Sequence, residues 1–152
     1  IGSIVGGSAA EGKRLKKSFL DKTPALKKLR NDVQKVVRKR GYLIGLDGRK
    51  LHIRSPHAAL NTLLQSAGAL VMKKALVLLD EDLQAAGLVP NGVDYEFVVN
   101  VHDEYQIEVS EHFAEQVGQM AAEAIRKAGR YFKFRCPLDA EYKIGANWAE
   151  TH

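Results

Sequence analysis

The 152-residue sequence predicts an α+β fold, in which helices come first and an antiparallel sheet packs on long helices. Apolar residues recur with the helical period of about 3.6 residues over 24–40 and 56–86. Between 97 and 109 they alternate instead with the period of two that is typical of a half-buried strand. Because the two patterns occupy separate blocks of the chain, helices and sheet are expected to form separate layers.

The first part of the chain is expected to hold two helices and a turn. Ser8 and Glu11 form a capping box for a helix that should end near Lys22. Thr23 is expected to cap a second helix, which has Pro24 at its first position and stops at Gly41. An Asp-Gly pair within 45–49 then predicts a tight turn, followed by a short extended piece at 50–54.

The rest of the chain is expected to hold a long helix, an interrupted strand pair, a further helix and two closing strands. The long helix should run from about Pro56 to about Ala86, and Ser110 should cap the further helix, which ends at Gly129. The closing strands are expected at 131–136 and 138–144. The core stripe of the long helix is expected to include Leu60, Leu63, Leu64, Ala67, Leu70 and Val71.

Composition limits the classes of protein to consider. With 45% hydrophobic residues the chain can bury one real core. Its single cysteine, Cys136, cannot form an internal disulfide, which favours a reducing compartment. We expect no membrane partner, and no apolar stretch that approaches the ~20 residues of a membrane helix. The chain begins with Ile1 rather than methionine, which suggests processing or a fragment.

Charge is distributed unequally along the chain. Residues 1–54 carry a net charge of +11 and residues 55–152 a net charge of −6. A strongly basic surface attracts polyanions, of which the phosphate backbones of nucleic acids are the commonest inside cells. The alternative on charge alone is a solvated basic helix face that has no partner.

Three ionisable residues, His102, Asp103 and Glu104, interrupt the predicted strand pair in "NVHDEYQIEV". We expect Asp103 and Glu104 to form the two-residue connection of a hairpin, with both carboxylates at its tip. Two hard oxygen ligands at one point suit Mg²⁺, which binds through one or two carboxylates together with waters and substrate phosphates. The alternative is a polar hairpin turn without a ligand.

A second set of polar residues lies on the long helix. His57, Asn61, Gln65 and Gly68 follow one another at spacings of four, four and three, so they share one helix face. Asn and Gln side chains carry both donors and acceptors, which is what the reading of base edges requires. The alternative is a solvated helix face.

The stretches "GLDGRKLHIRSPHAALNTLLQSAGAL", "VHDEYQ" and "CPLDAEYKIGANW" resemble the C-terminal end of family A DNA polymerases, and within that family the replicative polymerases of T-seven-like bacteriophages. The resemblance implies a helical remnant of the fingers subdomain at 1–48 and part of the palm subdomain at 49–152. It places Asp103 at the motif C aspartate, which binds two catalytic magnesium ions together with an aspartate of motif A. Glu104 takes the supporting acidic position, and His102 lies near the primer end. The DNA contacts that it implies are Asn61, Gln65, His57, Arg54 and Arg49.

The implied activity is the addition of deoxynucleotides to a primer 3′ end during phage DNA replication, in the cytoplasm of an infected bacterium. The implied cofactor is Mg²⁺, and the implied partners are primer-template DNA, deoxynucleoside triphosphates and the missing N-terminal polymerase portion as a separate chain. Motif A and the nucleotide-binding fingers helix are not found in this sequence, so this chain alone is expected to be inactive.

The sequence departs from the family at several points. His57 stands where many cellular relatives have arginine, Tyr105 stands where an aliphatic residue is common, and the chain after Arg40 suggests a shortened fingers segment. The alternatives are a non-catalytic DNA-binding module and a subunit of a split polymerase. A metal nuclease is less favoured, because the other carboxylates fall mostly on predicted helix surfaces.

Overall fold

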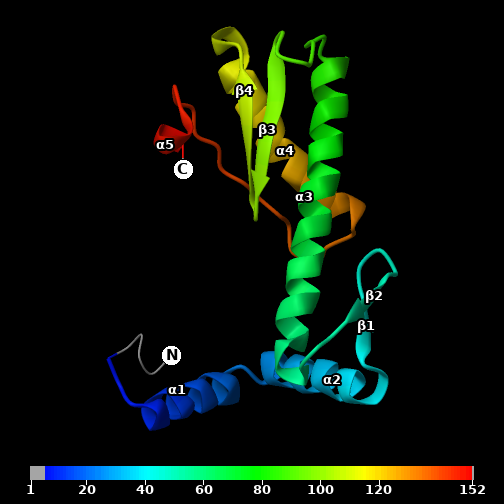
Figure 1. Ribbon diagram of the computed structural model, residues 1–152, viewed down its shortest axis with the longest axis vertical. Helices are drawn as coiled ribbons and strands as arrows, with labels where there is room; N and C mark the ends of the chain where they lie inside the picture. Colours follow the sequence, from blue (N-terminus) through cyan, green and yellow to red (C-terminus); the bar gives the residue numbers. More distant parts are fainter. Residues whose placement is uncertain (1–5, 152) are drawn as a thin grey trace. The chain divides into compact units, whose positions relative to one another are not determined.

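The computed structural model describes residues 6–151, and the chain divides into two compact units, Ile1–Leu64 and Gln65–His152 (Figure 1). Helices and short antiparallel strands make up both units, which confirms the α+β prediction. The strands form two separate two-stranded sheets rather than one larger sheet. The predicted boundary between fingers and palm after residue 48 stays a prediction.

The first unit begins with helices α1 (Ala9–Lys22) and α2 (Pro24–Arg40). Ser8 caps α1 as predicted, since its hydroxyl accepts a hydrogen bond of 3.2 Å from the Glu11 backbone N–H. Thr23 occupies the N-cap position of α2, but its hydroxyl donates to the Phe19 carbonyl (2.7 Å) and does not cap α2. Gly41 ends α2 in the left-handed conformation, with φ of 75°.

A small hairpin packs on α2. Strands β1 (Tyr42–Ile44) and β2 (Lys50–His52) pair antiparallel around the predicted turn, in which Gly48 has φ of +79°. Four residues form the buried cluster of this unit: Val33, Val37, Leu43 and Ala59. Gln34 is also buried, and its Nε2 has no hydrogen-bond partner among the residues that the structure describes.

The predicted long helix is present, with a different core stripe. A 3₁₀ turn, η2 (Pro56–Ala58), leads into α3 (Ala59–Ala85), which begins in the first unit and continues into the second. Leu64, expected in the core, is 59% exposed. The buried positions on α3 are Ala59, Val71, Ala75, Leu79 and Leu83. The last four are spaced by four residues, so they form one stripe along the helix.

The segment Pro56–Ala85 is long and apolar enough to cross a membrane, by length and composition only, with a mean hydropathy of 1.4 in its most apolar window. The expectation that no apolar stretch has this length is therefore wrong. Such a helix is weak evidence for a membrane span, because a core helix passes the same test. The stripe from Val71 to Leu83 is buried in the core of the second unit, which accounts for part of the apolar composition.

The interrupted strand pair forms as β3 (Tyr95–Val101) and β4 (Glu104–Val109), paired antiparallel. A bulge between Phe97 and Val99 adds one residue to β3, so that Phe97 pairs with Ile107 but Val99 pairs with Gln106. Directly paired residues lie on the same face of an antiparallel sheet. Phe97 therefore lies on the core face, whereas Val99 lies with Gln106 on the opposite face. The simple alternation expected for Phe97, Val99 and Val101 is wrong beyond Phe97.

Helix α4 (Ala114–Tyr131) follows a 3₁₀ turn, η3 (Glu111–Phe113), and packs its apolar stripe into the core with α3 and the strands. Ser110 does not cap a helix by its side chain, because its hydroxyl donates to the Val93 carbonyl (3.1 Å). The helix runs two residues past its predicted end at Gly129.

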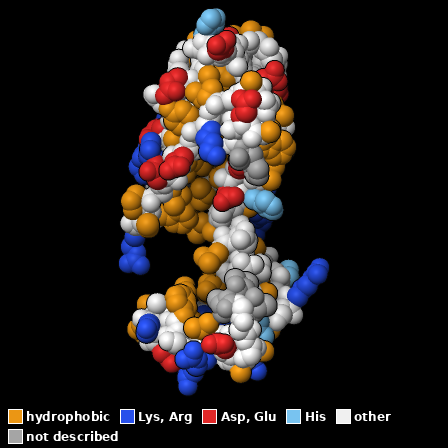
Figure 2. Space-filling view, turned by 90° about the vertical axis from the view of Figure 1, so that its left-hand side faces the viewer, with side chains coloured by type: hydrophobic (Ala, Val, Ile, Leu, Met, Phe, Trp, Pro, Cys, Tyr) orange, Lys and Arg blue, Asp and Glu red, His pale blue; other side chains and the backbone are white. Residues whose placement is uncertain are grey.

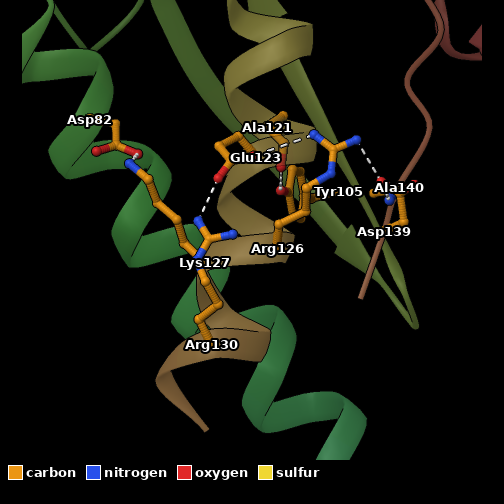
Figure 3. A network of polar contacts seen from close by, with 9 residues as sticks. All are labelled: Asp82, Tyr105, Ala121, Glu123, Arg126, Lys127, Arg130, Asp139 and Ala140. Carbon is orange, nitrogen blue, oxygen red and sulfur yellow. Dashed lines mark hydrogen bonds and ion pairs between the residues drawn. The ribbon is translucent and has the colours of Figure 1, made fainter. Parts of the chain in front are cut away.

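The strands predicted at 131–136 and 138–144 are absent from the part of the chain that the structure describes. Residues 137–145 have no regular secondary structure and pair with neither sheet that the structure describes. A side-chain contact ties this segment to α4 instead: Arg126 binds Asp139 (2.6 Å), as Figure 3 shows. Lys127 of α4 binds Asp82 of α3 (2.6 Å), which joins these two helices. The chain ends in a short helix, α5 (Trp148–Thr151). Cys136 is exposed.

Candidate active site

The tip of the β3–β4 hairpin lies one residue earlier than predicted. Val101 pairs with Glu104, so the two-residue connection is His102–Asp103, and Glu104 is the first residue of β4. The expected connection of Asp103 and Glu104 is therefore wrong. His102 has φ of 56°, a left-handed conformation that non-glycine residues rarely adopt outside tight turns. Asp103 is exposed at the tip, and Glu104 is half-buried.

Glu104 is held on the face of the sheet that points away from the core. Its Oε1 accepts a hydrogen bond from the Trp148 indole N–H (3.3 Å) and another from the Gln106 amide. Gln106 in turn accepts a hydrogen bond from the Thr151 hydroxyl (3.1 Å). Gln106, Trp148 and Thr151 are not among the site residues that the sequence predicts. The period of two places Gln106 beside Glu104, but no local pattern connects Trp148 or Thr151 with a residue more than 40 positions earlier.

Tyr105 anchors the strand on the opposite face. Its hydroxyl donates to the Ala121 carbonyl of α4 (3.2 Å), and burial raises the pKa of this hydroxyl to about 12 (Figure 3). The phenol therefore stays protonated and remains a donor at neutral pH. The base of the hairpin tip is thus tied to the core, while His102 and Asp103 face solvent.

The two carboxylates fit part of a magnesium site. Carboxylate oxygens are hard ligands, and Mg²⁺ commonly takes only one or two of them from a protein. Within residues 6–151, however, no three His, Cys, Asp or Glu side chains lie close enough together to hold a metal ion. Asp103 and Glu104 can therefore supply part of a coordination shell that needs further ligands from elsewhere.

The predicted DNA-binding residues belong to a different part of the chain. Arg49, Arg54, His57 and Asn61 lie in the first unit, and Gln65 is the first residue of the second. All five side chains are exposed. Arg49 differs from the others because it forms an ion pair with Asp47. Asn61 and Gln65 are one turn apart on α3, so their amides lie on the same side of the helix.

Basic side chains gather on the first unit. A cleft of about 260 Å³ between α1 and α2 is lined mostly by cationic side chains, together with Leu20 and Asp21. Figure 2 shows lysine and arginine side chains projecting from this unit into solvent. The cations that line the cleft are Lys13, Lys16, Lys17, Lys27 and Arg30.

A larger hollow of about 520 Å³ lies between α3 and β3 of the second unit, but no predicted site residue lines it. Its wall carries the carboxylates of Asp80, Glu81 and Glu96 beside Tyr95. The Tyr95 hydroxyl donates to Asp80 (2.6 Å), and burial together with this bond raises the pKa of Tyr95 to about 12. The hollow is therefore acidic and is separate from the hairpin tip.

An α+β chain with a carboxylate-bearing hairpin and a basic helical unit fits the polymerases that act on nucleic acids. The model of DNA polymerase family A matches residues 2–150. The chain therefore belongs to DNA polymerase family A, which confirms the resemblance seen in the sequence.

Named relatives agree with this assignment. The chain is 45% identical to the DNA-directed DNA polymerase of Enterobacteria phage T3 and 45% identical to that of Escherichia phage T7, in each case over the whole of this chain and 24% of the relative. The polymerase of Escherichia phage Phieco32 is 37% identical over the whole chain and 25% of its own length. The chain thus spans about a quarter of the length of the curated relatives that it matches.

A solved structure has the same fold. The POL domain of Pol1 from M. smegmatis, in complex with DNA primer-template and dNTP, matches with a TM-score of 0.71 and 25% sequence identity. The match covers 92% of this chain and 25% of that chain.

Proposed function

We propose that this chain forms the C-terminal part of a phage DNA-directed DNA polymerase, which adds deoxynucleotides to a primer 3′ end in the cytoplasm of an infected bacterium. The observation that carries the proposal is Asp103, which lies exposed at the two-residue tip of a hairpin in a chain that matches family A over residues 2–150. The proposed partners are primer-template DNA and a deoxynucleoside triphosphate, the ligands with which the M. smegmatis POL domain is in complex.

In this role the hairpin presents Asp103 to the reacting groups. The ladder of β3 and β4 and the bond from Tyr105 to Ala121 hold the tip, so the carboxylate needs little reorganisation. Asp103 and Glu104 would hold Mg²⁺ together with ligands from a preceding part of the polymerase. When bound, the metal lowers the pKa of the primer hydroxyl and stabilises charge on the leaving pyrophosphate.

The first unit and the start of α3 would hold the DNA. Lysine and arginine side chains along α1 and α2 neutralise phosphates, and this attraction does not depend on base sequence. Asn61 and Gln65 can donate to and accept from base edges in the minor groove. Arg49, Arg54 and His57 would contact the DNA near these amides.

The runner-up function is a non-catalytic DNA-binding module or a subunit of a split polymerase. The net charge of +11 on residues 1–54 supports DNA binding without chemistry, and Asp103 and Glu104 alone do not complete a metal site. A split polymerase would be completed by a second polypeptide that carries the missing part.

Primer extension by a chimera tests the proposal. In the chimera this chain replaces the matching quarter of the phage T7 polymerase, which is 45% identical. Asp103→Asn should reduce single-nucleotide addition by a factor of about 10²–10³, because it removes a charge that stabilises the transition state. Glu104→Gln should be milder, and both variants should bind primer-template DNA like the parent.

The matched control is Glu108→Gln, which neutralises an exposed carboxylate on the same strand. It should extend primers at the parental rate. A chimera in which Asp103→Asn is as active as the parent would show that the hairpin is only a polar turn. A parent that binds DNA but extends no primer would favour the non-catalytic module.

A further inference from the structure

The short helix α5 lies against the face of the β3–β4 hairpin that carries Glu104. Figure 1 shows α5 on one side of this hairpin and α3 on the other. Tyr105 points from β4 toward α4, where it bonds Ala121, so its neighbours Glu104 and Gln106 point to the α5 side. The bulge in β3 places Val99 and Val101 on this same side. The face beneath α5 is therefore a mixed polar and apolar surface next to the hairpin tip.

Two donors converge on one oxygen of Glu104. The Trp148 indole N–H donates to Oε1 (3.3 Å), and the Gln106 amide donates to the same atom. The hydroxyl of Thr151, one turn after Trp148, lies 3.1 Å from the carbonyl oxygen of the Gln106 side chain and 3.2 Å from the Trp148 carbonyl, so its one proton is shared between them. The bond to Gln106 orients the Gln106 amide toward Glu104. The contacts of Trp148 and Thr151 thus both orient the Glu104 carboxylate, the first directly and the second through Gln106.

The helix itself is held by local and long-range contacts. Glu150 accepts hydrogen bonds from the Ala146 backbone N–H (2.9 Å) and the Asn147 side-chain amide (2.8 Å), so the residues before α5 are tied to the helix. Upstream, the Tyr142 hydroxyl donates to Glu115 of α4, and this carboxylate raises the pKa of Tyr142. The Tyr142 ring lies against Gly118, where a Cβ atom would come within 2.3 Å of it. The path from α4 to α5 is therefore fixed at several points.

We propose that α5 positions the Glu104 carboxylate beside Asp103, with Trp148 and Thr151 as positioning residues of the metal site. A glutamate side chain has several rotatable bonds, and fixing it costs conformational entropy each time a metal binds. Donors that hold Oε1 beforehand reduce this cost and fix the direction of the carboxylate. Hydrogen bonds to metal ligands commonly change metal affinity by a factor of about 10–100. The inference rests on the proposed function, because it assigns a role within that same site.

The docking of α5 can be measured without any activity. Trp148 is the single tryptophan of the chain, so its fluorescence reports on α5 alone. Because this residue is 47% exposed, complete release should raise acrylamide quenching by about twofold. Glu104→Ala, which removes the acceptor, should approach that value. Thr151→Val, which removes the hydroxyl at nearly constant shape, should give a smaller rise.

Glu108→Gln is the matched control, because it alters another carboxylate of β4 and should leave quenching at the parental value. Circular dichroism confirms that each variant is folded. Parental quenching in folded Glu104→Ala and Thr151→Val would overturn the proposal, since α5 would then be held by other contacts.

The effect on the metal site is measured in the T7 polymerase chimera. Trp148→Phe keeps an aromatic ring but removes the N–H, so half-maximal primer extension should need roughly tenfold more Mg²⁺, while primer-template affinity stays unchanged. A parental magnesium dependence overturns the proposal, and so does a loss of DNA affinity that accounts for the lower rate. If the parental chimera extends no primer, the proposed function and the metal role of α5 fail together, but the quenching result still decides whether α5 holds Glu104.

Discussion

The two units of the chain differ in charge and in the size of their cores. The first carries the net charge of +11 and buries a cluster of four hydrophobic residues among those that the structure describes. The second carries −6, and its cluster has ten such residues within the described range. The predicted roles of the two units also differ. The first unit has basic side chains at its surface, whereas the second has a hairpin that carries carboxylates and packs on a core.

The proposed roles of the two units place different physical demands on them. Phosphate binding needs many exposed cations, and these repel one another when no DNA is present. A metal site needs a carboxylate whose position is fixed, and this requires the strands and helices around it to be well packed. We therefore expect the first unit to respond to salt and ligand, and the second to respond to core substitutions.

The largest expected effect concerns salt. The chain should bind duplex DNA without sequence preference, and affinity should fall by a factor of about 10³–10⁵ between 50 and 200 mM salt if six to ten phosphates are contacted.

Replacing Lys13, Lys16 and Lys17 by Glu should weaken binding strongly. Replacing Lys133, Arg135 and Lys143 of the second unit by Glu changes the net charge equally and should matter much less. Fluorescence anisotropy at several salt concentrations measures both, and a salt slope near zero would contradict the role of the first unit.

Core truncations test whether the units are independent. Leu79→Ala removes a fully buried side chain and should lower the free energy of unfolding by about 2–5 kcal/mol. Val37→Ala in the first unit should cost about 2 kcal/mol or less, because fewer methyl groups are lost. Urea unfolding followed by Trp148 fluorescence reports the second unit and should shift only for Leu79→Ala. Equal shifts of this transition for both variants would show that the units unfold together.

The amide face of α3 is expected to have an intermediate effect. In the chimera, Asn61→Ala and Gln65→Ala should each weaken primer-template binding by about 1–3 kcal/mol if the amides contact base edges. The fold should be unchanged, because both side chains are exposed. Gln84→Ala removes an exposed amide at the other end of the same helix and serves as the control. Parental affinity in both variants would favour a solvated face.

The smallest expected effect concerns Gln34. Its buried Nε2 lacks a partner among residues 6–151, and a buried donor without a hydrogen bond is destabilising by about 1–3 kcal/mol. Gln34→Met has a similar volume and no amide, so it should raise the free energy of unfolding of the isolated chain by about 1 kcal/mol. Gln84→Met, at an exposed site, should change it little. A destabilised Gln34→Met would indicate that the amide is satisfied in solution.

Local signals in the sequence predicted most elements correctly. The Ser8 cap, the stop at Gly41 and the turn at Gly48 depend on neighbouring residues, and the structure confirms each. The hairpin was also predicted, because polar residues interrupted two alternating runs. Its connection was misplaced by one residue, since the pairing of Val101 with Glu104 depends on where the ladder ends rather than on residue type.

Features that depend on contacts between residues far apart in the sequence could not be predicted from local patterns. Residues 138–144 alternate like a strand, but a strand needs a partner, and neither described sheet provides one. Leu64 has the right spacing for a core position, yet burial depends on what packs against it. The contact of Trp148 with Glu104 joins residues 44 positions apart, and no periodicity reports it.

The bulge in β3 also limits how the length of this strand can change. From Phe97 to Val101 the strand has one more residue than the segment from Glu104 to Ile107 that it pairs with. One codon could therefore be deleted here while the hairpin keeps its two-residue connection, since the ladder would simply become regular. A second deletion would have to shorten the connection itself and would remove His102 or Asp103 from its place. Relatives of this chain should accordingly tolerate the loss of a single residue in β3, but not of two.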